Sequence, residues 1–223
     1  RLSRSLDELI ARRSGFLVDY QDAAYATRYR QLVDAVRKAE QRVAPGSTAL
    51  TEAVARYFFK LMAYKDEYEV ARLYTSGDFL KRVAQQFEGD YQVRFHLAPP
   101  LFAKRDEQGR LQKKEYGPWM FKAFGLLARL KGLRGSRFDI FGHTAERRGE
   151  RQLIADYERT LQELLGSLDA GRLALAVEIA SIPEHIRGYG HVKEAHLHDA
   201  RAREAALLAT WRNPKALHIV QAA

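Results

Sequence analysis

The stretch at residues 53–75 reads AVARYFFKLMAYKDEYEVARLYT, and its pattern of apolar residues decides the fold class. Apolar or aromatic side chains recur every three or four residues, which is the spacing of one face of an α-helix. These side chains belong to Val54, Tyr57, Phe58, Leu61, Tyr64, Tyr68 and Ala71. The face is too wide and too aromatic for a helix at the surface. We therefore predict one central helix through this stretch, capped by Thr48 and ended at Gly77.

The tyrosines on that face predict a polar network along one edge of the helix. A buried tyrosine hydroxyl needs a hydrogen-bond partner, and charged side chains lie within about one helical turn. The predicted network consists of Tyr64, Lys65, Tyr68, Glu69 and Arg72. Either it only satisfies the buried hydroxyl groups, which is the common role of such residues, or it also serves a site.

The same periodicity predicts helices along most of the remaining chain. A capping box from Ser5 to Glu8 indicates a helix from Leu6 to about Arg13. The other predicted helices cover residues 16–43, 79–87, 117–130, 144–168, 173–182 and 192–211. The helix at 117–130 is apolar on almost every side, so we expect it to be buried. We expect the loop at 134–143 to be packed against the body, because Phe138, Ile140 and Phe141 are unfavourable to expose together.

One small β element is predicted at about residues 91–116. Tyr91, Val93, Phe95 and Leu97 alternate with polar residues, which is the pattern of a half-buried strand. The polar segment 110–116 can return beside it, and such a hairpin needs helices to lie on. The fold class is therefore mainly α, a multi-helix, bundle-like arrangement with one small β element. Without a repeat or a low-complexity linker, we expect a single domain at 1–213 and a frayed tail at 214–223.

Composition excludes several classes of function. The 223 residues contain no cysteine, which excludes disulfides and cysteine-ligated iron–sulfur clusters in this chain. No apolar run is long enough to span a membrane and no signal-peptide core is visible, which favours the cytoplasm. The net charge of +9 comes from 37 basic and 28 acidic residues that are interspersed along the helices. With no recognition motif beside it, this charge indicates a surface for an acidic partner rather than nucleic acid.

The histidines near the C-terminus lack the spacing of metal ligands. Among His185, His191, His196 and His198, the pair His196 and His198 cannot place both rings on one helix face, and His191 and His198 are two turns apart, too far to bind one ion. We therefore predict no metal site. We also find no catalytic residue, because no nucleophile has a partner at motif spacing.

The segment RGYGHVK at residues 187–193 is the best candidate for binding an anion. It places two glycines and three basic or titratable side chains just before a helix, where backbone amides also point outward. The candidate residues are Arg187, Gly188, Gly190, His191 and Lys193. The alternative is that the glycines only turn the chain, since glycine adopts positive φ without strain.

Six blocks of sequence resemble the C-terminal region of the fused bacterial indolepyruvate ferredoxin oxidoreductases, which are relatives of the 2-oxoacid:ferredoxin oxidoreductases. The blocks read FKLMAYKDEYEVARLYT, QFEGDY, FHLAPP, YGPWM, LKGLRG and RGYGHVK, at residues 59–75, 86–91, 95–100, 116–120, 130–135 and 187–193. With the segments around them, the likeness extends from about Ser5 to Trp211.

The resemblance implies a parent enzyme that converts arylpyruvates to aryl-acetyl-CoA and passes electrons to ferredoxin. Thiamine diphosphate, 4Fe–4S clusters and CoA are the cofactors and co-substrate implied for that parent. None of these cofactors is assigned to this chain, which lacks the cysteine clusters and a thiamine signature. We therefore expect a non-catalytic accessory domain, inactive alone, whose partners are the catalytic domains of the same polypeptide, with oligomers possible. The alternative is a ligand-binding part of the enzyme that contacts CoA or substrate through residues 187–193.

Overall fold

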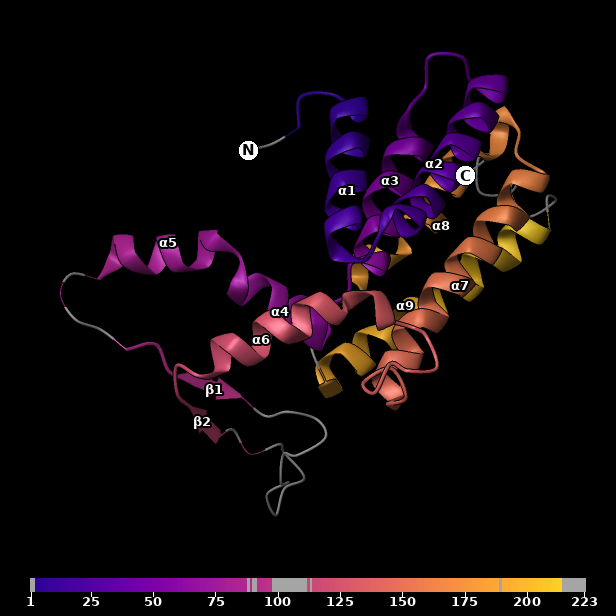
Figure 1. Cartoon of the computed structure of the whole chain (residues 1–223). Helices are drawn as coiled ribbons and strands as arrows, with labels where there is room; N and C mark the ends of the chain where they lie inside the picture. The colour runs from indigo at the N-terminus through magenta and orange to yellow at the C-terminus, as the bar shows by residue number, and fades with distance from the viewer. Residues whose placement is uncertain are drawn as a thin grey trace. The chain divides into compact units, whose positions relative to one another are not determined.

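Helices make up most of the chain in the computed structural model, so the predicted mainly α class is confirmed (Figure 1). The structure describes residues 3–87, 89, 92–97, 112, 114–188 and 190–213, without the side chains of Asp78 and His191. The predicted tail at 214–223 lies outside these residues. In chain order the elements are α1 (Leu6–Tyr20), α2 (Ala23–Val43), α3 (Ala49–Met62), α4 (Glu67–Thr75), α5 (Gly77–Gln86), β1 (Phe95–Leu97), β2 (Lys114–Tyr116), α6 (Met120–Arg129), η1 (Leu130–Leu133), α7 (Ala145–Gly166), η2 (Ala170–Arg172), α8 (Leu173–Ala180), η3 (Ile182–His185) and α9 (Gly190–Arg212).

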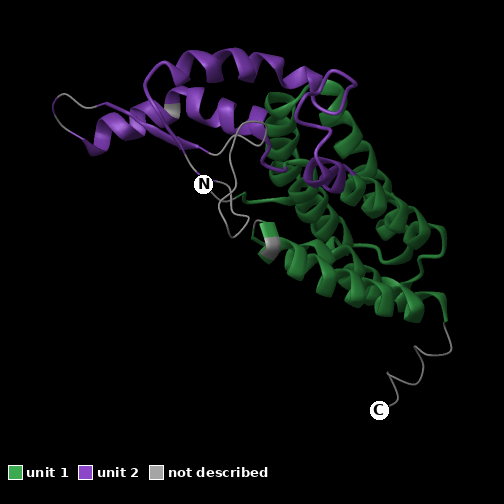
Figure 2. Cartoon of the chain, turned by 90° about the horizontal axis from the view of Figure 1, so that it is seen from below, with its two compact units in different colours: residues 1–63, 152–223 green, residues 64–151 purple. Residues whose placement is uncertain are grey.

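The chain divides into two compact units (Figure 2). Unit 1 comprises Arg1–Ala63 and Gln152–Ala223, and unit 2 comprises Tyr64–Arg151. The boundary falls inside α7, so the first residues of that helix belong to unit 2 and the rest to unit 1. Each unit is described by itself below.

Unit 1 is a helical bundle built around a stack of three aromatic rings. Tyr29 of α2, Phe58 of α3 and Tyr157 of α7 lie with ring centroids 6.0 and 5.9 Å apart and nearly parallel planes. The two hydroxyl groups at the ends of the stack donate to backbone carbonyl oxygens of Ala55 and Ala180, at 2.9 and 2.8 Å. Burial therefore leaves neither hydroxyl without a partner. Figure 1 shows α1, α2 and α3 side by side in this bundle.

The first two helices differ from the prediction at their junction. The helix that begins at Leu6 runs through Gly15 to Tyr20, and α2 begins only at Ala23. The predicted helix at 16–43 is wrong because Asp22 caps α2, accepting a hydrogen bond from the Tyr25 amide at 2.7 Å.

A buried carboxylate replaces the predicted cap of α3. Thr48 occupies the N-cap position but makes no side-chain cap hydrogen bond. Glu40, fully buried on α2, instead accepts from the backbone amides of Leu50 and Thr51 at 3.0 and 2.8 Å. It also accepts from the hydroxyl groups of Ser47 and Thr51 at 2.7 and 2.6 Å. A neighbouring helix thus provides both the acceptors and the negative charge that the start of a helix favours.

The predicted central helix is two helices. The first helix, α3, ends at Met62, and the second, α4, begins at Glu67. Asp66 caps the start of α4 by accepting a hydrogen bond from the Glu69 amide at 2.9 Å. Asp66 is itself held by Arg134, whose guanidinium donates to both carboxylate oxygens at 2.5 and 2.8 Å. Periodicity alone does not reveal this break because the apolar spacing continues through it.

Unit 2 packs α4 and α6 on the predicted β element. The two strands pair antiparallel, with Phe95 opposite Tyr116, so the small β element is confirmed. Phe95 is buried against Phe124 of α6 and Tyr74 of α4, with ring centroids 5.2 and 5.1 Å away. The hairpin therefore rests on helices, as a two-stranded sheet requires.

Two burial predictions in unit 2 are wrong. Trp119 and Leu126 were expected inside with the rest of residues 117–130, but they are 60% and 63% exposed. In the 134–143 loop, Phe138 and Ile140 are 62% and 60% exposed, and Phe141 alone of the three aromatic and aliphatic residues is packed, edge-on against Tyr68. A single side of α6 suffices to cover the small sheet, so the opposite side stays in solvent.

Candidate functional site

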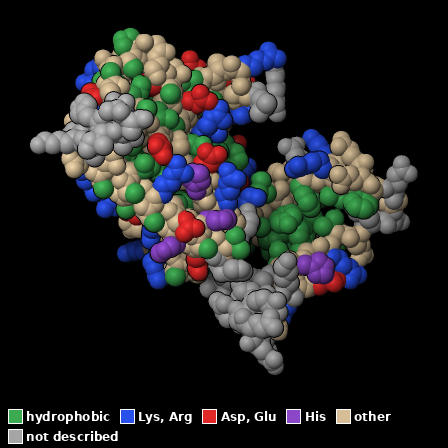
Figure 3. All heavy atoms as spheres, turned by 180° about the vertical axis from the view of Figure 1, so that it is seen from behind, with side chains coloured by type: hydrophobic (Ala, Val, Ile, Leu, Met, Phe, Trp, Pro, Cys, Tyr) green, Lys and Arg blue, Asp and Glu red, His purple; other side chains and the backbone are tan. Residues whose placement is uncertain are grey.

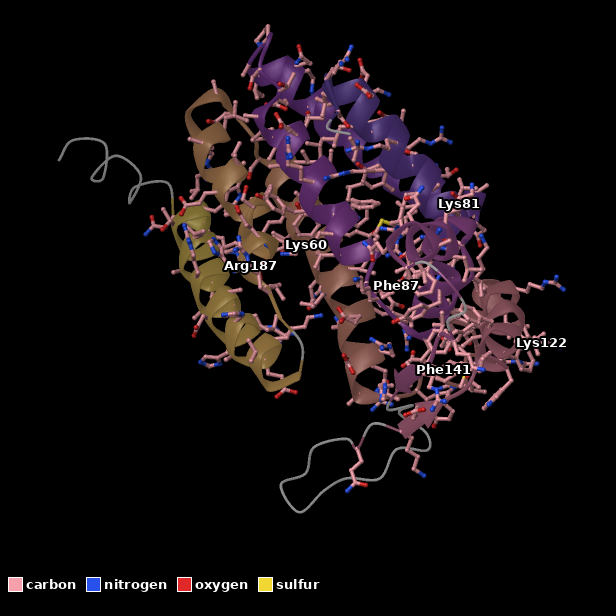
Figure 4. The ribbon with its side chains drawn as sticks, turned by 90° about the vertical axis from the view of Figure 1, so that its left-hand side faces the viewer. Lys60, Lys81, Phe87, Lys122, Phe141 and Arg187 are labelled. Carbon is pink, nitrogen blue, oxygen red and sulfur yellow. The ribbon has the colours of Figure 1, made fainter. Side chains whose placement is uncertain are left out.

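An open groove of about 420 Å³ in unit 1 is lined in part by Arg187, one of the predicted anion-site residues. It is lined by His185, Arg187, His196, Asp199, Ala200 and Arg203, and we call it the α9 groove. Four of these residues recur at the spacing of one face of α9, and the other two come from η3 and the turn before α9. Figure 4 labels Arg187 beside this helix.

The turn from Arg187 to Gly190 is shaped by its glycines. Gly188 and Gly190 have φ values of +87° and +54°, so the turning role considered for them is present. A Cβ atom at Gly188 would lie 2.8 Å from Cγ1 of Val192. His196 closes the turn, because its Nδ1 donates to the Arg187 carbonyl oxygen at 2.8 Å.

The positive charge at this turn extends to α3. Lys60 donates from Nζ to the carbonyl oxygens of Pro183 and Glu184 at 2.7 and 3.1 Å (Figure 4). Burial lowers the pKa of Lys60, and the charges of Arg187 and Lys193 lower it further while Glu184 opposes them. Arg187, Lys60 and Lys193 therefore raise a common positive potential around the turn, which an anion would lower.

Carboxylates compensate part of that charge. Arg203 donates to Glu178 at 2.7 Å and lies 3.2 Å from Nε2 of His185. Arg187 donates from Nε to the Glu184 carbonyl oxygen at 3.0 Å, and its ion pair with the Glu184 carboxylate is longer, at 3.4 Å. Asp199 also lines the groove. The α9 groove is thus a mixed surface in which an anion competes with exposed, weak ion pairs.

The structure brings together three of the five predicted anion-site residues. Arg187, Gly188 and Gly190 form the turn, Lys193 follows in the first turns of α9, and the His191 side chain is outside the described residues. Sequence reasoning missed Arg203, and it considered His185 and His196 only as metal ligands, a role that it rejected. The helical spacing of residues 196, 199 and 203 is the signal that groups them on one face.

A small cavity of about 40 Å³ lies elsewhere in unit 1. Leu61, Leu153 and Ile182 provide apolar walls, and Glu204 of α9 contributes a carboxyl group. Burial raises the pKa of Glu204, and a 3.2 Å hydrogen bond from Thr160 opposes that shift only in part. The cavity is large enough for about one or two waters and too small for a substrate.

Three of the residues in the predicted polar network make polar contacts in unit 2. Glu69 and Arg72 form a bidentate ion pair at 2.8 Å, and the Tyr68 hydroxyl donates to Asp139 at 3.1 Å. Tyr64 is buried, which raises the pKa of its hydroxyl, whereas Lys65 is exposed. Lys65 therefore lies outside the network that the sequence predicted.

The centre of the network consists of residues that sequence reasoning missed. Asp66, Arg134 and Asp139 are each at least 94% buried, and Arg134 also lies over the ring of Tyr68 at 5.5 Å. Asp66 and Arg134 are 68 positions apart in sequence. A local sequence pattern does not reveal such a pair, because the two residues are too far apart in sequence to belong to one motif.

Unit 2 displays most of the exposed apolar side chains in the described part of the chain. Figure 3 shows hydrophobic side chains gathered on the face of unit 2 seen in that view. Eight of the ten exposed large hydrophobic residues belong to this unit, and we call these eight the unit 2 surface. Its members are Leu73, Leu80, Phe87, Trp119, Leu126, Leu130, Phe138 and Ile140. Exposed apolar side chains that form a contiguous patch mark interaction sites.

The part of the chain that the structure describes contains no group of three or more histidine, aspartate, glutamate or cysteine side chains arranged to hold a metal ion. None of the described helices combines the length and the apolarity needed to cross a membrane.

Comparison with known proteins returned one match. The model of a family described as a family of unknown function, DUF6537, matches residues 6–206. No curated protein and no solved structure matches the chain.

Proposed function

We propose that this chain, which belongs to the DUF6537 family, is a non-catalytic accessory and interaction domain at the C-terminus of an enzyme like the fused indolepyruvate ferredoxin oxidoreductases. In this proposal thiamine diphosphate, the 4Fe–4S clusters, CoA binding and electron transfer to ferredoxin belong to the cytoplasmic parent enzyme. The chain docks on the catalytic domains of the same polypeptide and helps to assemble or cover them.

The observation that carries the proposal is the unit 2 surface. Its eight exposed apolar side chains belong to a unit of 88 residues that has its own packed core. The exposed area of those side chains therefore lies outside that core. Burying them against a partner would release water from apolar area, at roughly 25 cal/mol per Å². Trp is also among the residues that dominate binding energy at interfaces, and Phe is enriched in interfaces.

Hydrogen exchange tests this proposal directly. The amides of α6 are compared in the isolated chain and in the full-length polypeptide, where we expect docking to slow their exchange. Trp119→Ser with Leu126→Ser should restore fast exchange in the full-length polypeptide. The matched control is Lys122→Ser, which changes an exposed polar residue of the same helix and should leave the protection intact. Equal exchange of α6 in the two proteins would contradict docking through this surface.

The α9 groove supports a second candidate function, in which the chain helps to bind CoA or an anionic substrate. The supporting observation is the convergence of Arg187, Arg203, His185 and His196 on one open groove. Phosphate groups are bound by such clusters through charge-assisted hydrogen bonds. A phosphate ligand would have to displace the ion pairs with Glu184 and Glu178.

Calorimetric titration of CoA distinguishes this second function. Arg187→Gln with Arg203→Gln should abolish the heat of binding, and the wild-type affinity should fall as salt is added, because exposed charges are screened over about 8 Å at physiological ionic strength. Arg30→Gln with Lys38→Gln removes the same charge from the exposed face of α2 and should leave binding unchanged. Absence of binding heat in the full-length enzyme would remove this candidate.

A further inference from the structure

We infer that the 134–143 loop is the anchor by which unit 2 holds its partner, and that the partner presents an apolar pocket rimmed by carboxylates. This inference rests on the proposed docking function and names the site and the chemistry of the contact. It is carried by three features of the loop: a buried scaffold, an exposed apolar tip, and a one-sided charge.

Asp139 fixes the backbone of the loop from inside. Its carboxylate accepts from the amides of Gly135 and Gly142 at 2.7 and 2.9 Å, and from the Tyr68 hydroxyl at 3.1 Å. Gly142 has no room for a side chain, because a Cβ atom there would overlap the Asp139 carboxylate. Arg151 holds the other side by donating to the Gly142 carbonyl oxygen at 2.6 Å. Two turns of the loop are therefore closed on one buried carboxylate.

Arg134 fixes the start of the loop in the same way. Its guanidinium is buried against Asp66, with both carboxylate oxygens as acceptors, and against the ring of Tyr68. Burying charged groups is unfavourable unless they are paired in good geometry. In some proteins a buried ion pair fixes one conformation rather than adding stability, and that use fits the start of this loop.

The fixed loop presents its largest apolar side chains to solvent. Phe138 and Ile140 flank the buried Asp139, so alternation along the loop turns both outward. The Arg137 guanidinium lies over the Phe138 ring, 4.8 Å from its centroid. A guanidinium over an aromatic ring is an attractive cation–π contact, and arginine is among the residues enriched at the energetic centre of interfaces. Because the backbone is already ordered, binding would lose little conformational entropy.

The charge at the tip selects the chemistry of the partner. Arg137 and His143 are the exposed charged or titratable residues of the loop, since Asp139 and Arg134 are buried. The exposed Arg148 follows, donating to the His143 carbonyl oxygen at 2.6 Å, and Glu146 is the nearby exposed acid. Unit 2 as a whole has 18 basic and 12 acidic residues, a net charge of +6. A pocket with acidic residues on its rim is complementary to this tip, and such complementarity governs partner choice.

Photocrosslinking in the full-length polypeptide tests the inference. p-Benzoyl-phenylalanine replaces Phe138 in one protein and Trp119 in another, and the crosslinked peptides are identified by mass spectrometry. We expect position 138 to crosslink to a catalytic domain, in a segment with apolar residues next to aspartate or glutamate. Arg137→Glu should lower that yield about tenfold, whereas Arg129→Glu, the same charge reversal at an exposed site of α6, should leave most of it.

The two positions separate failure of the anchor from failure of docking. Crosslinks from position 119 but not from 138 would overturn the anchor and leave the docking function standing. Absence of crosslinks to a catalytic domain from both positions would overturn both. Crosslinks from 138 to a second copy of the chain, recognised by mixing isotopically heavy and light protein, would also overturn the inference. So would crosslinks to lipid in the presence of anionic vesicles, or an Arg137→Glu yield equal to that of Arg129→Glu.

Discussion

Replacing Glu40 with glutamine should destabilise unit 1 far more than the loss of one charge at a surface. The wild-type carboxylate accepts four hydrogen bonds, from two amides at the start of α3 and from the hydroxyl groups of Ser47 and Thr51. Each carboxylate oxygen accepts one amide and one hydroxyl. Glutamine keeps one oxygen and places an NH₂ group at the other position.

The expected loss in the free energy of unfolding depends on the groups that face the NH₂ group of the glutamine. A hydroxyl group can rotate and accept from the NH₂, but a backbone N–H cannot. Either orientation of the amide therefore leaves one buried amide of Leu50 or Thr51 without an acceptor, at about 1–3 kcal/mol. Loss of the negative charge at the helix start adds about 0.3–1 kcal/mol. We expect Glu40→Gln to lower the free energy of unfolding by about 2–4 kcal/mol.

The dependence on pH provides an internal check. Burial alone would raise the pKa of Glu40, but the hydrogen bonds from Thr51, Ser47 and Leu50 outweigh it and hold the pKa below its ordinary value of 4.5. A depressed pKa in the folded state contributes stability that is present above the unfolded pKa and is lost as pH falls through the folded pKa. The difference between wild type and Glu40→Gln should therefore shrink below about pH 4.5.

Urea denaturation followed by circular dichroism measures the change, and hydrogen exchange at Leu50 and Thr51 locates it. The matched control is Glu52→Gln, which makes the same replacement in the first turn of α3, where the carboxylate is half exposed and paired with Arg56. It should cost less than about 1 kcal/mol. Equal losses in the two variants, or a Glu40→Gln difference that does not shrink in acid, would refute the assignment of Glu40 as the cap.

Three further predictions concern the packing of the two units. Arg134→Met should destabilise unit 2 by about 3–5 kcal/mol, because it leaves Asp66 buried without its counter-charge. Adding Asp66→Asn to the same protein should recover part of this loss in denaturant titrations. If the effects of the two substitutions were strictly additive, the pair would be uncoupled. Glu204→Gln should stabilise unit 1 near pH 7 but not near pH 4, because a pKa raised in the folded state makes wild-type stability fall as pH rises above the ordinary value; an equal effect at both pH values would exclude that origin. Leu61→Ala should cost about 2–5 kcal/mol and the exposed Arg56→Ala less than about 1 kcal/mol, and equal losses would show that the face of α3 is misassigned.

Periodicity predicted the parts of the fold that depend on local burial. The alternation around Phe95 found β1, and the apolar spacing before Trp211 found α9 to within two residues of its observed ends. The signal at β1 works because Phe95 is buried and its neighbour His96 is exposed. Apolar spacing failed at 16–43 and 53–75, where the apolar face continues across a break.

The breaks themselves depend on single polar side chains whose role is set by tertiary contacts. Asp22 is a cap by residue type, yet aspartate also occurs inside helices, so its position alone does not end one. Asp66 starts α4 while bound to a distant arginine, and Glu40 caps α3 from another helix, where a sequence search expects Thr48. Such long-range contacts leave no trace in local spacing.

Of the two candidate sites, sequence reasoning found one and missed the other. The RGYGHVK segment was found because glycines and charges lie together in sequence, and the structure places its glycines in a turn. The unit 2 surface was missed because hydrophobic residues are expected inside, and burial there was the stated prediction for Phe138 and Trp119. Sequence patterns rank residues by their tendency to be buried, whereas an interaction surface consists of the exceptions to that tendency.

The placement of the two tryptophans gives each unit its own optical signal. Trp211 in unit 1 is 2% exposed, with the Arg172 guanidinium 4.5 Å from its ring, whereas Trp119 in unit 2 faces solvent. Their fluorescence should therefore separate without any label: a blue-shifted emission shielded from iodide for Trp211, and a red-shifted, quenchable emission for Trp119. Unfolding of unit 1 moves the first signal to the red, and coverage of unit 2 moves the second to the blue. The chain thus reports melting and docking in opposite spectral directions.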